Sequence, residues 1–199
     1  DGGEAGLHPS NIHDTAYSVG AVDYTGDMPV ILGPDGPSLG GFTCPAVVIE
    51  ADRWKLGQLA AGDRVRFEAV SASVARDLAM AQEHTLAGRA LAPPSAPPIR
   101  RGAPLPADGV LDRRAATASL PEVTYRQSGD GDVLVGCGQM RLDIDLRVRV
   151  QLRYGALRAR RDDGEWRGIV DLTPGVRSLQ IHFDPVRLGA GVPDDVAAL

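Results

Sequence analysis

The chain has 199 residues, enough for one ordinary domain or two small ones. Its hydrophobic content of 43% and charged content of 24% are typical of a globular protein and exclude an intrinsically disordered one. The net charge is −5, from 21 basic and 26 acidic side chains, which argues against a protein that neutralises nucleic-acid phosphates. No apolar run reaches the length of a membrane span. We therefore expect neither nucleic acid nor membrane as a partner.

The two cysteines, Cys44 and Cys137, lie far apart and follow no metal-ligand spacing. A secreted domain held together by disulfides normally contains more cysteines, so we expect a reducing, cytoplasmic location and no metal site. The chain starts at Asp1 rather than Met, carries no signal peptide, and stops where a helix expected from Asp194 onward has barely begun. We expect it to be a fragment of something longer.

Residues 1–70 are rich in Gly and Pro and contain short β-type runs. The predicted strands are Val19–Tyr24, Pro29–Leu32, Ala46–Glu50 and Arg64–Val70. Asp52 is predicted to cap a short helix over Arg53–Leu59. Pro and Gly interrupt the segment GPDGPSLGG (Gly33–Gly41) throughout, which predicts irregular structure. This part of the chain is therefore predicted to be a small all-β unit with one helical crossover.

A helix is predicted from Ser71 to Leu91, with Ser71 or Ser73 as its N-cap. Its predicted apolar face consists of Val74, Leu78, Ala81, Thr85 and Leu86. Six of the fifteen residues 92–106 are proline, which is typical of an extended, semi-rigid linker. We therefore divide the chain into domains at 1–91 and 120–199, with a linker over 92–119.

Residues 120–199 are predicted to form a small α+β unit. The predicted strands are Glu122–Arg126, Val133–Cys137, Ile169–Leu172 and Ser178–Phe183, joined in pairs by SGDGD and TPGVRS turns. The segment between the two pairs is ambiguous. Strict alternation from Leu142 to Leu152 favours a strand, whereas its length and its Arg-rich end favour a helix. Taken alone, the alternation of apolar and polar residues favours the strand.

Three carboxylates, Asp14, Asp23 and Asp27, lie close together near the start of the chain. Asp23 stands within an apolar β-type run, where alternation allows it to face either water or a cleft. In a cleft its carboxylate would need a cationic or donor-rich partner. Asn11 and Asp14 are equally consistent with local turn residues. The residues alone leave both interpretations open.

Motifs for nucleotides and metals are missing from the sequence. It contains no Gly-rich phosphate loop and no H-E-x-x-H or Cys/His quartet. His8 and His13 are five residues apart, and hydrogen-bonding loop residues are a better interpretation of them than metal ligands.

The run His8–Phe67, above all GDMPVILGPDGPSLGGF (Gly26–Phe42) and WKLGQLAAGDRVRF (Trp54–Phe67), resembles the carboxyltransferase region of the urea carboxylase family. That region is similar to the C-type component of 5-oxoprolinases, formerly described as the second component of allophanate hydrolase. From Leu120 the chain resembles the start of the B-type component, formerly described as the first component of allophanate hydrolase. The resemblance implies a mainly β fold with α+β: a partial cyclophilin-like β-barrel, then a small α/β domain. It also implies that Asp143–Arg160 is a helix.

In this family, ATP and Mg act at a biotin carboxylase domain, and biotin is attached to a carrier domain of the same polypeptide. The resemblance implies that both domains lie outside this chain, which helps to pass a carboxyl group to a nitrogen of urea or guanidine. The implied catalytic residues are Asp14 and Asp23. The implied substrate-binding residues are Asn11, Tyr17, Asp23, Asp35, Ser38, Gly40 and Gly41, with the loop Pro34–Gly41 closing over the substrate.

Asp23 leads to a hypothesis about the substrate, because urea-specific relatives often carry Asn at this position. A carboxylate suits the parallel N–H donors and positive charge of guanidinium, so the hypothesis is that guanidine is carboxylated. Two alternatives remain: an ATP-dependent 5-oxoprolinase made of fused B-like and C-like components, and a non-catalytic module resembling a kinase inhibitor. We expect the isolated chain to be inactive because neither barrel is complete.

Overall fold

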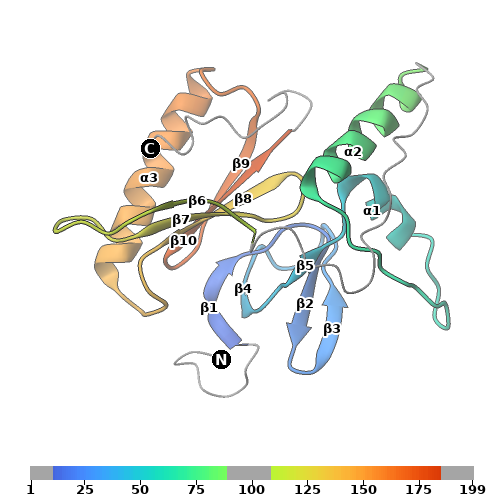
Figure 1. Ribbon diagram of the computed structural model, residues 1–199, viewed down its shortest axis with the longest axis horizontal. Coiled ribbons are helices and arrows are strands. Elements are labelled where there is room, and N and C mark those ends of the chain that lie inside the picture. The colour runs from blue at the N-terminus through green and yellow to red at the C-terminus, as the bar shows by residue number, and fades with distance from the viewer. Residues whose placement is uncertain (1–10, 89–108, 185–199) are drawn as a thin grey trace.

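The computed structural model describes residues 11–88 and 109–184, which form two neighbouring β-rich parts (Figure 1). The strands of the first part are β1 (Asn11–Ala16), β2 (Ala21–Thr25), β3 (Met28–Ile31), β4 (Leu39–Phe42) and β5 (Ala46–Val47). β1 pairs with β4, and β2 lies between β3 and β5, all antiparallel. The helices α1 (Glu50–Leu56) and α2 (Ala72–Leu86) follow and contact each other.

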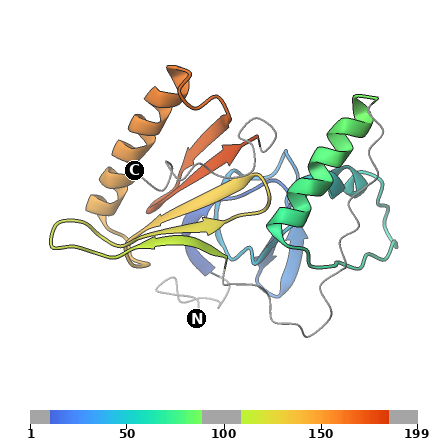
Figure 2. The same cartoon turned by 45° about the horizontal axis from the view of Figure 1, so that its top comes forward.

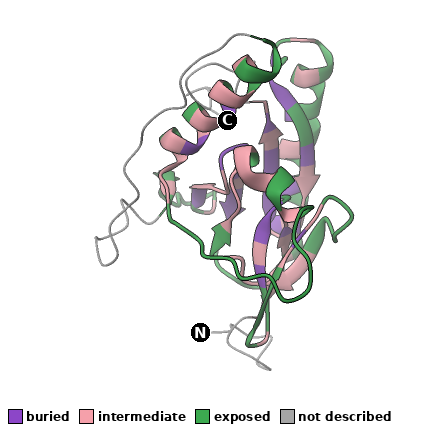
Figure 3. Cartoon of the chain, turned by 90° about the vertical axis from the view of Figure 1, so that its right-hand side faces the viewer, coloured by how far each residue is buried: buried purple, intermediate pink, exposed green. Residues whose placement is uncertain are grey.

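Two strands of the first part lie where the sequence predicts loop. β1 covers Asn11–Ala16, and β4 begins inside the segment predicted to be irregular. Pairing with β1 stabilises the glycine-rich β4 despite its low strand propensity, because tertiary pairing overrides local preference. The strand predicted over Arg64–Val70 is wrong. That segment has no partner strand and is almost entirely exposed, which Figure 3 shows as a long green stretch after α1.

Both helices of the first part are present, with differences in detail. α1 begins at Glu50 rather than Arg53, which shortens the strand predicted over Ala46–Glu50, and no side chain of its own caps it. α2 begins as predicted after Ser71, whose Oγ accepts a hydrogen bond from the Val74 amide at 3.3 Å. Its buried residues are Ala75 and Ala79, on a different face from the one predicted.

The second part is one antiparallel sheet of five strands in the order β6-β7-β8-β10-β9. These strands are β6 (Val110–Arg114), β7 (Val123–Gln127), β8 (Asp132–Cys137), β9 (Ile169–Pro174) and β10 (Ser178–Phe183). The four strands predicted here are confirmed, and β6 adds a fifth from within residues 92–119. The helix expected from Asp194 lies outside the described residues, as do residues 89–108, so the division into domains stays a prediction.

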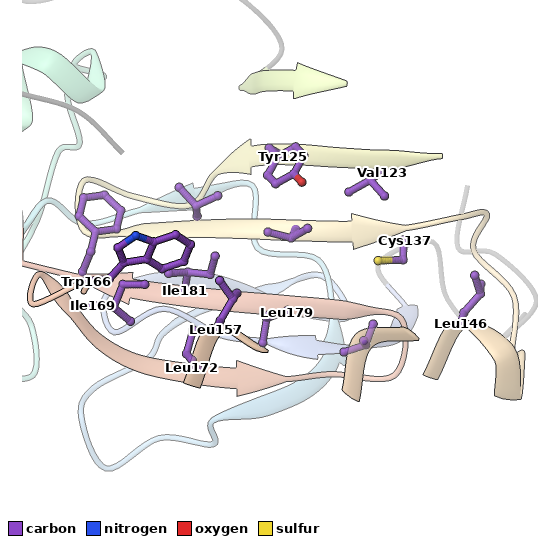
Figure 4. Close-up of a cluster of buried hydrophobic side chains, with 14 residues drawn as sticks. Val123, Tyr125, Cys137, Leu146, Leu157, Trp166, Ile169, Leu172, Leu179 and Ile181 are labelled. Atoms are coloured by element: carbon purple, nitrogen blue, oxygen red, sulfur yellow. The ribbon is translucent and has the colours of Figure 1, made fainter. Parts of the chain in front are cut away.

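The ambiguous segment is the helix α3 (Ile144–Asp162), as the resemblance implied, and the strand favoured by its period is wrong. Asp143 caps it by accepting a hydrogen bond from the Asp145 amide at 2.9 Å. The helix covers one face of the sheet (Figure 2). Leu146, Val150 and Leu157 point from it into the apolar cluster drawn in Figure 4, where Leu179 of β10 is fully buried. This layer is the main core of the molecule.

The first part has a thinner core, whose buried hydrophobic residues among those described are Ala16, Ala21, Leu32, Ala75 and Ala79. Its two sheets contain two and three strands and stay open over the described residues. The mainly β class with α+β is therefore confirmed, whereas the cyclophilin-like barrel stays an expectation.

Polar contacts join the two parts. The carboxylate of Asp130, which is 1% exposed in the turn after β7, accepts hydrogen bonds from the Glu50 amide at 3.2 and 3.0 Å. The hydroxyl of Ser18 lies 2.8 Å from that of Ser128 and accepts a hydrogen bond from Gln180 Nε2 at 3.1 Å. Asp130 thus satisfies a donor at the start of α1 and places a negative charge near its N-terminus.

Replacing Asp130 with Ala is expected to lower the free energy of unfolding by about 1–3 kcal/mol, because the Glu50 amide loses the acceptor that the buried carboxylate provides. Guanidinium chloride unfolding of the chain measures this change. Asp77→Asn on α2 is the matched control, because Asp77 is exposed and forms no such contact. Equal stability of Asp130→Ala and the control would show that this contact does not stabilise the fold.

Candidate functional site

A cavity of about 370 Å³ lies between the two parts. One wall comes from β1, from the ends of β2, β4 and β5 and from the loops beside them, and the other comes from β7, β8, β10 and the loops beside them. Its polar lining residues include His13, Asp14, Thr15, Tyr17, Ser18, Thr43 and Cys44 on the first wall and Arg126, Ser128, Arg177 and Ser178 on the second. The cavity is therefore large enough for a small polar molecule and is lined by both acidic and basic groups.

Asp14 and Tyr17 are the predicted catalytic and substrate-binding residues that line this cavity. The Tyr17 hydroxyl accepts a hydrogen bond from the Phe42 amide at 2.8 Å. The pKa of Tyr17 is raised to about 12, chiefly by burial and also by the nearby carboxylates of Asp23 and Asp14, whereas the backbone hydrogen bond with Phe42 acts in the opposite direction. Tyr17 is therefore protonated at neutral pH and serves as a hydrogen-bond donor, not as a base.

The second part of the chain positions Asp14. The Val176 amide, in the turn between β9 and β10, donates a hydrogen bond to the Asp14 carbonyl at 3.2 Å. In the neighbouring residue, the Thr15 hydroxyl lies 3.0 Å from that of Ser178. Asp14 itself is exposed and faces the cavity. Its placement therefore depends on residues more than 150 positions later in the sequence.

Asp23 faces the protein interior, which answers the question that its β-type alternation left open. It is 5% exposed, and its Oδ1 has no hydrogen-bond partner among the described residues. Burial raises its pKa, and its carboxylate in turn raises the pKa values of Tyr17 and Cys44. Asp23 does not line the cavity but lies behind these two lining residues. It therefore acts on the cavity through its charge.

Gly40 and Gly41 lie on β4, next to Asp14 and Tyr17. A Cβ added to Gly40 would clash with the Tyr17 ring, and one added to Gly41 would lie 3.2 Å from Asp14 Oδ1. Neither glycine lines the cavity. Their lack of a side chain lets β4 pack closely behind the two lining residues.

The three other predicted residues lie outside the cavity lining. Asn11 begins β1, and its buried Oδ1 has no partner in the described part of the chain. Asp35 and Ser38 are exposed. Ser38 contributes through its carbonyl, which accepts a hydrogen bond from the Tyr17 amide at 3.0 Å. The structure thus gathers Asp14, Tyr17, Gly40 and Gly41, with Asp23 behind them, and leaves these three apart.

Arg126 and Arg177 line the cavity and were missed by the sequence reasoning. A Cβ on Gly136 would lie 3.5 Å from Arg126 Nη1 and 3.6 Å from Arg177 Nη1, so both guanidinium groups lie beside this glycine. No carboxylate among the described residues forms an ion pair with either arginine. Fifty-one positions separate them in sequence, and only the alignment of β7, β8 and β10 brings them together. No local motif could have revealed the pair.

Cys44 also lines the cavity. Burial, together with the smaller effect of the Asp23 carboxylate, raises the pKa of its thiol to about 12. The thiol is therefore neutral and a poor nucleophile at physiological pH. Within residues 11–88 and 109–184, no group of three or more His, Cys, Asp or Glu side chains is arranged to hold a metal ion, and no helix is long and apolar enough to cross a membrane.

Gly40→Ala is expected to destabilise the chain by about 1–3 kcal/mol, because the new methyl group must displace the Tyr17 ring. Gly155→Ala on α3 is the matched control. Nothing lies within 4 Å of a Cβ at Gly155, and alanine favours the helix by about 1 kcal/mol. The midpoint temperature of thermal unfolding is expected to fall for Gly40→Ala and to rise for Gly155→Ala. A higher midpoint for Gly40→Ala would contradict the packing described for Tyr17.

Asp23→Asn is expected to stabilise the chain at pH 7 by about 1–3 kcal/mol, because it removes a buried charge without a partner. The raised pKa of Asp23 means that the folded state binds more protons than the unfolded state just above pH 3.8, so stability falls as the pH rises through this window. The gain should therefore disappear near pH 3. Thermal unfolding of both proteins at the two pH values tests this. A variant that is less stable than the parent at pH 7 would show that the carboxylate has a stabilising partner.

Residues 1–69 match the sequence family described as "Carboxyltransferase domain, subdomain A and B". The chain is 42% identical to the urea amidolyase of Lachancea kluyveri over 194 residues, covering 96% of this chain and 10% of that protein. It is 38% identical to the urea amidolyase of Saccharomyces cerevisiae, covering 92% and 10%. The solved structure of Kluyveromyces lactis urea carboxylase superposes with a TM-score of 0.78 at 40% identity, over 94% of this chain and 16% of that one.

The matches to the urea amidolyases and to the solved structure extend over both parts of the chain, whereas the family match covers only the first part. The chain spans about a tenth of the length of the curated urea amidolyases that it matches. It is therefore homologous to the carboxyltransferase region of urea amidolyases and urea carboxylases, and corresponds to a short segment of them.

Proposed function

We propose that this chain, as a homologue of the carboxyltransferase region of urea amidolyases, forms part of the site at which a longer biotin-dependent enzyme carboxylates urea. The observation that carries the proposal is the cavity between the two parts, with Asp14 and Tyr17 on one wall and Arg126 and Arg177 on the other. Both walls lie within the segment that the relatives share.

The proposed reaction forms one carbon–nitrogen bond and breaks another. A urea nitrogen would gain the carboxyl group that bound biotin supplies and would give up one proton, which biotin would take in exchange, so that the atoms balance. The product carries a carboxylate on the former urea nitrogen. The chain must therefore hold urea in position and accept hydrogen bonds from its N–H groups.

Tyr17 and Asp14 match the two sides of urea. The Tyr17 hydroxyl accepts from the Phe42 amide, which leaves its own proton to be donated to the urea carbonyl. The only described acceptor for that proton, the Phe42 carbonyl, lies at the long distance of 3.4 Å. The Asp14 carboxylate accepts N–H groups and can relay the proton that leaves the attacking nitrogen. Asp23, behind Tyr17, disfavours ionisation of the phenol and so keeps the donor in place.

Guanidine has no support from the relatives, whose names specify urea. The hypothesis based on Asp23 required its carboxylate to contact the substrate, and this side chain does not line the cavity. A hydroxyl donor such as Tyr17 suits a urea carbonyl, which guanidinium lacks. Urea is therefore the substrate that we propose.

Biotin would supply the carboxyl group, on a carrier domain outside this chain, with ATP and Mg used at a separate biotin carboxylase domain. The residues present fit its ring system. Phe42 and Val47 on the first wall and Leu134 and Met140 on the second add apolar residues to the cavity lining. These four residues would hold the ring and exclude water from the reacting groups.

Asp14→Asn and Tyr17→Phe in the full-length polypeptide are each expected to lower kcat/KM for urea about 100-fold. Each substitution removes a side-chain group that would bind urea or accept its proton. ATP hydrolysis that depends on both urea and biotin measures this loss. Biotin carboxylation in the absence of urea should stay unchanged, since it takes place on another domain.

Asp77→Asn on the exposed face of α2 is the control and should keep the parental activity. Wild-type protein that turns over guanidine faster than urea would overturn the proposed substrate. Full activity in both Asp14→Asn and Tyr17→Phe would show that this cavity is not the carboxyltransferase site.

A further inference from the structure

We propose that Arg126 and Arg177 form an anion subsite that binds the carboxylate carried by the acceptor nitrogen, so that this group points toward the second wall of the cavity. The inference rests on the proposed function and assigns to the arginine pair a ligand of defined chemistry: a planar carboxylate attached to an amide nitrogen.

The first step of the argument is the unbalanced charge of the pair. Both guanidinium groups line the cavity and approach the same glycine, Gly136. No acidic side chain among the described residues offsets them by an ion pair. Two like charges held together in a partly buried place destabilise the protein unless a ligand compensates them. Burial, and then the charge of Arg126, lowers the pKa of Arg177, which agrees with this.

The second step is how the arginines are held. Arg126 lies on β7 and Arg177 precedes β10, so both come from the sheet that rests on the main core. Arg177 Nη1 donates to the Gly138 carbonyl at 3.2 Å, which fixes one arm and leaves other N–H groups of its fork free. Gly136 between them has no side chain that would fill the space. A carboxylate can therefore accept from both forks there.

The third step is the opposite polarity of the two walls. Asp14 on the first wall repels an anion and accepts N–H groups, whereas the arginines on the second attract an anion. Urea itself is neutral and offers only N–H groups and a carbonyl. Once a carboxyl group is attached to one nitrogen, the molecule has an amide at one end and a negatively charged carboxylate at the other. The cavity thus matches the carboxylated molecule in one orientation, with the amide at Asp14 and Tyr17 and the carboxylate at Arg126 and Arg177.

The test is a binding comparison that requires no turnover. Malonamate has a methylene group in place of the nitrogen that carries the carboxylate, and malonamide is its neutral counterpart. Isothermal titration calorimetry of the full-length polypeptide without ATP is expected to show tighter binding of malonamate than of malonamide. Arg126→Gln and Arg177→Gln should each weaken malonamate about tenfold or more and leave malonamide unchanged.

Arg113→Gln on the exposed strand β6 is the matched control and should bind malonamate like the parent. Arg177→Lys keeps a charge but loses the fork, and we expect an intermediate affinity. Arg177 also donates a hydrogen bond to the Gly138 carbonyl, so circular dichroism is used to check that the Arg177 variants fold. Arg126→Gln tests the subsite without removing that hydrogen bond.

Equal affinity for malonamate and malonamide, or an equal loss of both in the arginine variants, would overturn the subsite. If bicarbonate alone shows the arginine dependence and malonamate does not, the pair binds a free one-carbon anion and the assignment is wrong. Urea carboxylation by wild-type protein is scored separately. If the wild-type protein carboxylates urea but malonamate binding does not depend on the arginines, only the subsite is rejected. If malonamate binding depends on the arginines but urea is not carboxylated, only the proposed function is rejected.

Discussion

The buried Asp130 carboxylate accepts hydrogen bonds from the Glu50 amide. This contact holds the turn after β7 against the start of α1. Ser18, Ser128 and Gln180 continue the same polar interface next to the cavity. Most of the apolar core lies on the other face of the large sheet, against α3. The candidate site therefore depends on hydrogen bonds of defined geometry between two parts that share little apolar core. Such contacts fix orientation strongly, because a buried polar group left without its partner is costly.

This arrangement separates the tasks of the two walls. The first wall supplies a carboxylate and a phenol that is held protonated, both suited to a neutral amide. The second supplies two arginines from a rigid sheet. Asp23 has no place in direct contact, yet its buried charge disfavours ionisation of Tyr17 and Cys44. Its burial without a partner is a cost that a fold selected for stability alone would avoid, which is typical of residues near functional sites.

How far the sequence predicted this structure depends on where the determining contacts lie. Four of the five strands of the second part were predicted because their patterns and turns are local, whereas β6 lies in the segment that was expected to be a linker. α3 has a strand-like alternation, and packing of Leu146, Val150 and Leu157 against the sheet, together with the Asp143 cap, stabilises the helix instead. β4 was missed because its glycines are used for close packing against Tyr17. Asp14 and Tyr17 were found through family resemblance, whereas the pairing of Arg126 with Arg177 depends on strand register and has no sequence signature.

The most direct measurement of the central claim is a crystal structure of the full-length polypeptide with bound urea. Our account predicts urea in the cavity between the two parts, with its carbonyl oxygen within hydrogen-bond distance of the Tyr17 hydroxyl and an N–H group facing Asp14. Urea bound elsewhere, with this cavity filled by another segment of the polypeptide, would contradict it.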